Sequence, residues 1–432
     1  MSTDRVRLIA SRLPRRQVAP AAALFAASLA LLVVAFQTLS SQPWSMLDLR
    51  VYLWGGRLVR HSHDPYLFFY AHYLHFTYTP EAAGFFALIS FIGVPVAEGL
   101  ITAASILSLL AVLWITAGAL PRWQATSRRL SATLAIGAVA LWLEPVRQTL
   151  SYGQVNLLLM ALIVADLCLP DSRWWKGAGV GLAAGFKLTP LIFVPYLLLT
   201  RRFRAAAVAT ATFALTVAGS VALLPKASEH YWFDGLFLNP HRLGNVAYVG
   251  NQSLYGALLR LLRTPAVAQP YQLAAVAVVG MCGLLFAAWA SRRGQEIIGI
   301  LVCALTGLLV SPVSWSHHWV WVAPMLMVLA YLATGPVALP QPRLWRVACW
   351  VGIVAIAALF SGVLWILRSS GTKPPIQGRV MTGGEQVVGD LYVLAAVLAL
   401  GVVAYVLVLS RRRDGRVTSG ERAVRSAAFD RN

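Results

Sequence analysis

Long apolar runs recur along the whole chain and constrain its fold more than any other feature. The first extends from about Ala19 to Leu39, and others of similar length follow up to about residue 410. A helix needs about 20 apolar residues to cross the roughly 30 Å of hydrocarbon in a bilayer. Because backbone N–H and C=O groups find no partner in lipid, these runs must be helical. The sequence therefore predicts an all-α polytopic membrane protein.

The composition and charge of the chain agree with that prediction. Of its 432 residues, 58% are hydrophobic and only 12% are charged, whereas soluble domains carry about 25% charged residues. The formal net charge of +20 could indicate nucleic-acid binding. However, the Arg and Lys residues cluster at the ends of the apolar runs, as the bias of membrane proteins toward cytoplasmic positive charge explains. We therefore expect membrane lipids, and no nucleic acid, as partners.

The apolar runs predict about twelve transmembrane helices. They lie at about 19–39, 80–97, 99–120, 130–143, 154–170, 176–200, 203–224, 271–291, 296–311, 319–334, 346–367 and 390–410. Basic residues before the first run and after the last place both termini in the cytoplasm. Residues 1–410 then form a single transmembrane domain, and 411–432 form a polar basic tail. The orientation of 81–175 stays open, because two short, broken helices in 176–200 would reverse it.

One long outward segment follows the first span, from about Ser40 to Pro80. It holds half of all the histidines, interleaved with aromatic residues. Residues 49–60 predict a short interfacial helix with arginines on one side. Asp48 stands where this helix would begin, so it is either an N-cap or a general base in dry surroundings; the two roles are compatible.

Zinc is the metal that ligand type alone would suggest for this segment. The candidate ligands do not have a zinc-site spacing, so we expect no metal site; they are His61, His63, Asp64, His72 and His75.

Three further side chains stand out because apolar sequence surrounds them. Lys187 lies inside a run that is otherwise long enough to span. A charge at membrane depth is a functional candidate by default, although Pro190 could bend the helix and let the lysine snorkel to water. His317 and His318 stand at an outward span end among tryptophans. Adjacent residues do not share a helix face, so we expect one of them to face a cavity.

Two short polar patches stand next to apolar helix ends, one at 153–156 and one at 250–260. Both carry side-chain amides, which offer a donor and an acceptor together and so suit hydroxyl-rich ligands. Helix capping is the alternative role for these amides.

Six short segments, taken in order, resemble family 87 of the GT-C glycosyltransferases. They are Asp48-Leu49-Arg50-Val51-Tyr52, Phe76-Thr77-Tyr78-Thr79-Pro80, Gly153-Gln154-Val155-Asn156-Leu157, Lys187-Leu188-Thr189-Pro190, Gly250-Asn251-Gln252-Ser253-Leu254 and Ser311-Pro312-Val313-Ser314-Trp315-Ser316-His317-His318. Within the family, the chain is most similar to mannosyltransferases that elongate phosphatidylinositol mannosides. The resemblance implies a GT-C fold in the bacterial inner membrane, with a long first periplasmic loop and an active site facing the periplasm.

The resemblance also implies the chemistry. The donor would be polyprenyl phosphate mannose, the acceptor a phosphatidylinositol mannoside glycolipid, and the product an α-1,2 linkage formed with inversion. Asp48 matches the family's catalytic base. It is followed by Leu49 and Arg50 rather than by a second carboxylate, which favours transfer without a metal or other cofactor. Lys187, His317 and His318 are the candidates for the donor phosphate. The remaining substrate-binding candidates are Arg50, Tyr52, Tyr78, Gln154, Asn156, Asn251, Gln252 and Trp315.

Other functions remain open at this stage. A mannosyltransferase that branches lipomannan or lipoarabinomannan, or an arabinofuranosyltransferase, would share these segments, since pocket shape decides between them. A lipid or sugar transporter is disfavoured, because transporters often show internal repeats and paired broken helices and no repeat is visible here.

Overall fold

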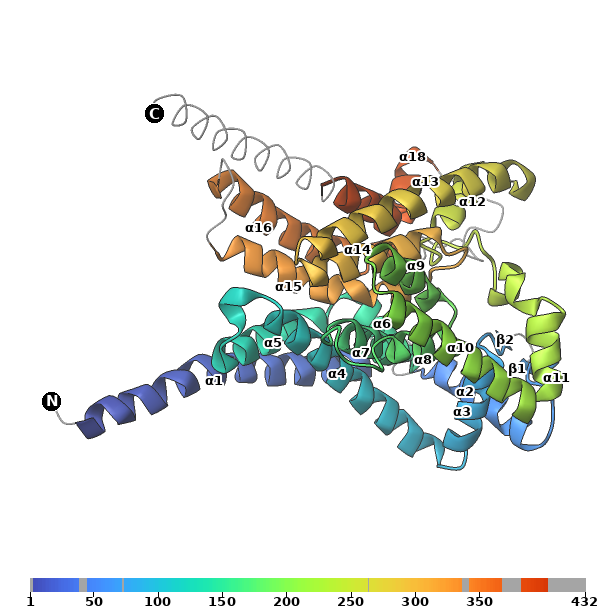
Figure 1. The fold of residues 1–432 in the computed structure, drawn as a ribbon, viewed down its shortest axis with the longest axis horizontal. Helices are drawn as coiled ribbons and strands as arrows, with labels where there is room; N and C mark the ends of the chain where they lie inside the picture. Colours follow the sequence, from blue (N-terminus) through green and yellow to red (C-terminus); the bar gives the residue numbers. More distant parts are fainter. Residues whose placement is uncertain are drawn as a thin grey trace, which may run out of the picture.

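The computed structural model describes residues 3–38, 45–71, 74–262, 264–335, 342–366 and 382–402. Figure 1 shows a stack of helices with α1 projecting at the N-terminal end and a small hairpin, β1 and β2, at the opposite side. The predicted cytoplasmic tail, 411–432, lies outside the described residues.

The first part of the chain alternates long and short helices. Strand β1 pairs antiparallel with β2, with Phe69 opposite His75 and Tyr70 opposite Leu74. The elements are α1 (Thr3–Thr38), α2 (Leu47–Arg60), β1 (Phe69–Tyr70), β2 (Leu74–His75), α3 (Pro80–Ile89), α4 (Val94–Gly118), η1 (Pro121–Trp123), α5 (Thr126–Ala140), α6 (Glu144–Tyr152) and α7 (Asn156–Leu167).

The middle of the chain contains most of the short helices, labelled η where they are 3₁₀ or π turns. They are α8 (Ala178–Phe186), η2 (Thr189–Ile192), α9 (Phe193–Leu199), α10 (Phe203–Leu223), α11 (Pro225–Ser228), η3 (Glu229–Phe233), η4 (Leu236–Leu238), η5 (Pro240–Leu243) and α12 (Leu254–Leu262). The last part holds α13 (Pro265–Arg292), α14 (Glu296–Val310), η6 (Ser316–Trp321), α15 (Val322–Ala333), α16 (Pro342–Leu359), η7 (Val363–Trp365), α18 (Gly383–Gly389) and a helix over Leu391–Val402.

A mostly helical membrane fold is confirmed, and the count of about twelve spans stays a prediction. Among the described residues, 5 helices are long and apolar enough to cross a membrane, or up to 7 if each of two bent helix pairs forms one span. The predicted spans at 80–97, 154–170 and 296–311 contain helices of 10, 12 and 15 residues. Hydropathy alone does not predict the caps and turns that end these helices early.

The predicted span at 176–200 is one of the broken regions. Helix α8 ends at Phe186, and Lys187 then has extended backbone, with φ −155° and ψ 126°. The chain continues as the 3₁₀ helix η2, which contains Pro190, and then as α9. This break corresponds to the alternative of two short helices, and it exposes polar backbone in the protein interior, where other segments can satisfy it.

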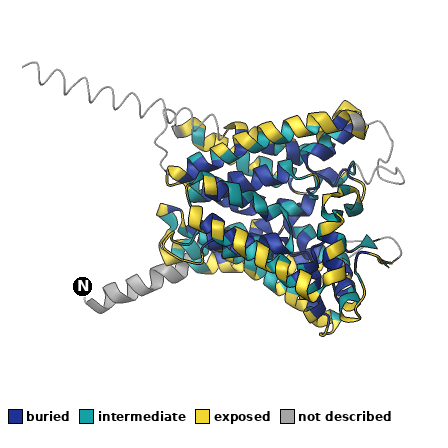
Figure 2. Cartoon of the chain, turned by 45° about the vertical axis from the view of Figure 1, so that its right-hand side comes forward, coloured by how far each residue is buried: buried dark blue, intermediate teal, exposed yellow. Residues whose placement is uncertain are grey.

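The core lies between the helices, and apolar side chains also cover the outside. Figure 2 shows buried residues concentrated in the interior of the stack and exposed ones on its outward faces. Large exposed side chains on α10 and α13 are apolar, among them Leu215, Leu223, Leu273 and Val278. Such outward faces suit lipid rather than water.

Candidate active site

A cavity of about 670 Å³ gathers residues from segments that are far apart in the sequence. Its walls come from α2, the β1–β2 hairpin, the α6–α7 link, the break after α8, the loop around η5, and η6. Eight of the predicted site residues line it: Asp48, Tyr52, Tyr78, Gln154, Lys187, Trp315, His317 and His318.

Asp48 lies in the first turn of α2, with its carboxylate partly exposed to the cavity. Met46 is the N-cap of this helix, and the cap makes no side-chain hydrogen bond, so Asp48 does not serve as the cap. Its Oδ2 instead accepts a hydrogen bond of 2.6 Å from Nε2 of Gln154. Tyr78 donates its hydroxyl to Oε1 of the same amide at 2.8 Å. The tyrosine therefore orients the amide so that its NH₂ group faces the carboxylate.

The surroundings of Asp48 raise its basicity. Burial raises the pKa of the Asp48 carboxyl to about 6, while the hydrogen bond from Gln154 and the nearby Lys187 ammonium act in the opposite direction. A carboxylate with a pKa near 6 is mostly ionised at neutral pH and is a better proton acceptor than an ordinary aspartate. The geometry therefore gives Asp48 the properties of a general base.

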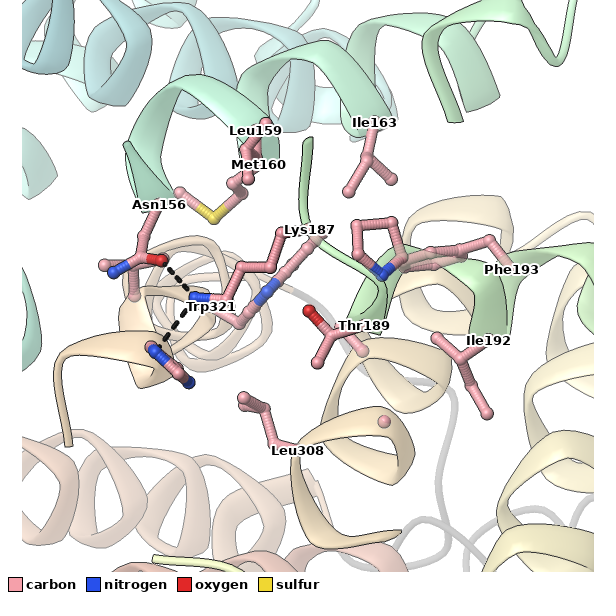
Figure 3. A pocket seen from close by; sticks show the side chains of 15 residues that line it. Asn156, Leu159, Met160, Ile163, Lys187, Thr189, Ile192, Phe193, Leu308 and Trp321 are labelled. Carbon is pink, nitrogen blue, oxygen red and sulfur yellow. Dashed lines mark hydrogen bonds between the residues drawn. The ribbon is translucent and has the colours of Figure 1, made fainter. Parts of the chain in front are cut away.

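Lys187 is held inside the protein at the break between α8 and η2. Its Nζ donates to Oδ1 of Asn156 at 3.0 Å and lies 2.9 Å from Nε2 of His318; Figure 3 shows these two contacts as dashed lines. The ammonium also lies 5.6 Å from the centre of the Tyr78 ring. With three polar or aromatic partners in the interior, the lysine does not need to snorkel to water.

A second pocket, of about 60 Å³, lies behind Lys187. Lys187, Thr189 and His318 line both spaces. The other walls of the small pocket are mainly apolar, as Figure 3 shows for Leu159, Met160, Ile163, Ile192, Phe193, Leu308 and Trp321. The lysine therefore stands between a polar cavity and an apolar recess.

His317 and His318 both line the cavity, whereas their adjacency predicted that only one would face it. Both lie in η6, a short 3₁₀ helix that contains a non-helical residue at Trp319. The two rings lie edge to face, 4.8 Å apart. His318 contacts Lys187, while the His317 ring packs against Tyr152 at 5.7 Å and its Nε2 has no hydrogen-bond partner among the described residues.

A buried layer beneath η6 fixes the histidines. Asn156 and Thr149 both donate to the backbone oxygen of His317, each at 3.0 Å. Glu144 is fully buried and accepts hydrogen bonds from Ser316, Trp365 and Tyr392 at 2.7 to 2.8 Å. This layer joins α6 and η6 to the C-terminal helices, so its hydrogen bonds restrict the movement of the cavity wall.

Four predicted substrate-binding residues lie outside the lining of the large cavity. Arg50 forms an exposed ion pair with Glu98 at 3.0 Å. The Asn251 amide contacts the backbone of Val246, Pro312 and Ser314. The Gln252 amide contacts the backbone of Val249, Gly389 and Tyr392. Both amides join chain segments, and neither side chain is exposed. Asn156 lines the small pocket and positions Lys187.

Sequence reasoning missed the residues that the loop around η5 contributes. Arg242 and Tyr231 line the cavity, and the Arg242 guanidinium lies 5.0 Å from the centre of the Tyr231 ring. The available signal was a basic pair, His241-Arg242, after Pro240 in the long segment between the apolar runs at 203–224 and 271–291.

The comparison with family models identifies the chain. The model described as glycosyltransferase family 87 matches residues 76–312, a region that includes Gln154 and Lys187 but begins after Asp48. The chain belongs to glycosyltransferase family 87. The resemblance drawn from six short segments is therefore confirmed.

Relatives within family 87 are similar over most of the chain. A polyprenol-phosphate-mannose-dependent α-(1-2)-phosphatidylinositol pentamannoside mannosyltransferase of Mycobacterium tuberculosis is 33% identical over 82% of this chain and 90% of its own length. A phosphatidylinositol mannoside mannosyltransferase of the same species, with the same donor in its name, is 33% identical over 77% of this chain and 81% of its own. The pentamannoside enzyme of Mycolicibacterium smegmatis is 36% identical over 64% of each. No solved structure matches the chain.

Proposed function

We propose that this chain transfers mannose from polyprenyl phosphate mannose to a mannose hydroxyl of a phosphatidylinositol mannoside, forming an α-1,2 linkage. The observation that carries the proposal is the contact between Asp48 and Gln154 beside Lys187 in the wall of a large cavity. Family 87 membership and the names of the relatives supply the class of donor and acceptor.

In the proposed reaction, Asp48 takes the proton from the acceptor hydroxyl as its oxygen attacks the anomeric carbon of the donor. The bond from that carbon to the phosphate oxygen breaks, and polyprenyl phosphate leaves. Direct displacement on a β-linked donor gives an α-linked product, through a transition state with oxocarbenium character. Gln154 holds the carboxylate in place while Tyr78 holds Gln154.

The leaving phosphate needs stabilisation of its charge rather than a general acid. Lys187 supplies a positive charge from a buried, fixed position, and His318 contacts it at 2.9 Å. We assign Lys187 and the two histidines to the donor side of the cavity, and Trp315 to the sugar rings, since aromatic side chains commonly line small-molecule sites. Tyr52 is buried with its ring stacked on Phe86, so we assign it to supporting the cavity wall.

The reaction is proposed to proceed without a metal or other cofactor. Asp48 is the only carboxylate in the cavity lining, and the described residues contain no group of three or more His, Cys, Asp or Glu side chains that could hold a metal ion. The proposed partners of the protein are membrane lipids, the lipid-linked donor and the glycolipid acceptor. We place the cavity on the periplasmic side of the inner membrane and both termini in the cytoplasm, as the distribution of arginines favours.

Purified full-length protein incubated with radiolabelled polyprenyl phosphate mannose and a panel of lipid acceptors tests this function. We expect label in a phosphatidylinositol mannoside, in a linkage that an α-1,2-mannosidase removes. A parallel reaction with a polyprenyl phosphate pentose covers arabinofuranosyl transfer. Transfer of the pentose alone, or no transfer from either donor, would contradict the proposal.

A further inference from the structure

Arg242 is a cation in the cavity lining whose charge the described part of the chain leaves uncompensated. Its Nη2 donates to the Tyr231 hydroxyl at 3.3 Å, and no carboxylate within 4.0 Å pairs with it. Its Nε and Nη1 are buried without a hydrogen-bond partner in the structure. Leaving charged donors unsatisfied is costly, so a ligand that accepts from them would bind favourably.

Arg242 is connected through packed tyrosines to Tyr78, which orients the Gln154 amide beside Asp48. Tyr231, beneath the guanidinium, stacks on Tyr66 with ring centres 5.3 Å apart. Tyr66 in turn donates to the backbone oxygen of Tyr78 at 2.8 Å. The 3₁₀ helix that carries Arg242 is capped by Asn239, whose side chain accepts from the backbone of His241 at 3.0 Å. The arginine is therefore held by the same packed layer that positions Tyr78.

The charges of the cavity lining favour an anionic ligand. Among the described residues, two basic side chains, Lys187 and Arg242, line it against the single carboxylate of Asp48. Lys187 already donates to Asn156 and contacts His318, so part of its binding capacity is used. Arg242 keeps most of its donors free, and a guanidinium matches phosphate oxygens better than any other side chain.

We propose that Arg242 binds the phosphate group of a lipid substrate in the cavity, as a contact separate from Lys187. The inference rests on the proposed function for the identity of that lipid, whose phosphate is either that of the polyprenyl donor or that of the phosphatidylinositol acceptor. In this division of roles, Arg242 anchors the phosphate during binding, and Lys187 acts closer to Asp48.

The first test measures binding of polyprenyl phosphate, which carries no mannose and so allows no transfer. If the donor supplies the phosphate that Arg242 binds, Arg242→Gln in the full-length protein should weaken binding of polyprenyl phosphate by about tenfold or more, the scale for losing one charge-assisted hydrogen bond. If the acceptor supplies it, the same loss should appear in binding of the phosphatidylinositol mannoside. Binding of polyprenol, which has no phosphate, should not change. Arg60→Gln is the matched control, because Arg60 is an exposed arginine outside the cavity lining that donates to the backbone oxygen of Ser90; it should bind polyprenyl phosphate as the wild type does.

The second test uses transfer kinetics to find which lipid supplies the phosphate. In Arg242→Gln, a raised KM for the donor at fixed acceptor concentration indicates that Arg242 binds the phosphate of the polyprenyl donor. A raised KM for the acceptor indicates that it binds the phosphate of the phosphatidylinositol. In either case kcat should fall by a smaller factor than KM rises. Arg242→Lys keeps the charge and should recover part of the affinity, so it carries the test if the Gln variant does not fold.

Unchanged polyprenyl phosphate affinity together with unchanged KM values for both lipids would overturn the inference. An equal loss of polyprenol and polyprenyl phosphate binding would also overturn it, because the residue would then only support packing. If the wild type binds polyprenyl phosphate through Arg242 but transfers no mannose, the proposed function fails while this inference stands.

Discussion

Asp48 acquires its basicity from residues that are distant in sequence. Gln154, 106 positions further along the chain, donates to its carboxylate, and Lys187 contributes a positive charge nearby. The sequence could single out all three residues, because polar side chains beside apolar runs are conspicuous. It could not show that they meet, since a one-dimensional pattern contains no information on which helix ends face each other.

The pH dependence of transfer follows from this environment. Because burial raises the pKa of Asp48 to about 6, the base is protonated below that pH, and we expect the mannosyl transfer rate to fall as pH decreases through about 6. The hydrogen bond from Gln154 lowers the pKa, so Gln154→Ala should shift the acidic limb of the profile to higher pH. A profile in Gln154→Ala that coincides with the wild type would contradict the coupling of these two residues.

Lys187 gives a second prediction at the residue scale. Lys187→Met should lower kcat while the protein still folds, because the substitution removes a buried charge and its desolvation cost together with the phosphate contact. Lys187→Arg should restore activity only partly, since a planar guanidinium does not fit where Asn156 and His318 hold a compact ammonium. Donor-saturation kinetics measure both. Unchanged kcat and donor KM in the Met variant would remove Lys187 from the donor side.

At the scale of elements, the close approach of α2 and α3 positions Asp48. A Cβ built on Gly56 would lie 2.4 Å from the backbone carbonyl of Phe86 in α3, so the two helices can pack this tightly only with glycine there. The sequence predicts α2 from its pattern, but its distance from α3 depends on this contact, which the pattern does not contain.

Gly56→Ala should therefore separate the two helices and displace Asp48. We expect lower transfer and a loss of stability of about 1–3 kcal/mol, the usual cost of overpacking. Gly99→Ala is the control, because it is also helical but has no atom within 4 Å of the added carbon, and it should be neutral or slightly stabilising. Thermal unfolding in detergent and the transfer assay measure both variants; equal behaviour of the two would contradict this packing.

The amides of Asn251 and Gln252 show a limit of sequence reasoning at the same scale. As residue types next to apolar helix ends, they resemble ligands for sugar hydroxyls. In the fold they hold backbone groups, and Asn251 also forms a β-bridge with Trp315. Trp315 lines the cavity, so these amides contribute by holding the segment that carries Trp315.

For the molecule as a whole, hydropathy predicted the membrane class but not where helices within the apolar runs end early. The interior of the stack contains short helices such as α7 and α14 and the break at Lys187. Apolar composition is the same in a short interior helix and in a helix that spans, so composition cannot separate them. The polar ends of these short helices meet in one place and form the cavity.

The chemistry of the whole cavity predicts resistance to chelators. Asp48 is the only carboxylate that the described part of the chain places in the cavity lining, so these residues do not provide the paired oxygen ligands that Mg²⁺ or Mn²⁺ prefers. We expect transfer to continue at an unchanged rate in EDTA. Loss of activity in EDTA that manganese or magnesium restores would show a metal requirement, and Asp64 and Glu81 would then be the first residues to test.

One substitution tests most directly the proposed role of Asp48 as the base in mannosyl transfer. Asp48→Asn keeps the size of the side chain and leaves an oxygen for Gln154, but it cannot accept the proton. The measurement is transfer of labelled mannose to the glycolipid acceptor by folded, membrane-inserted wild-type and variant protein. We predict a loss of at least about a hundredfold, the usual scale for a positioned base. Retention of more than about a third of the wild-type rate, well above that scale, would contradict the account.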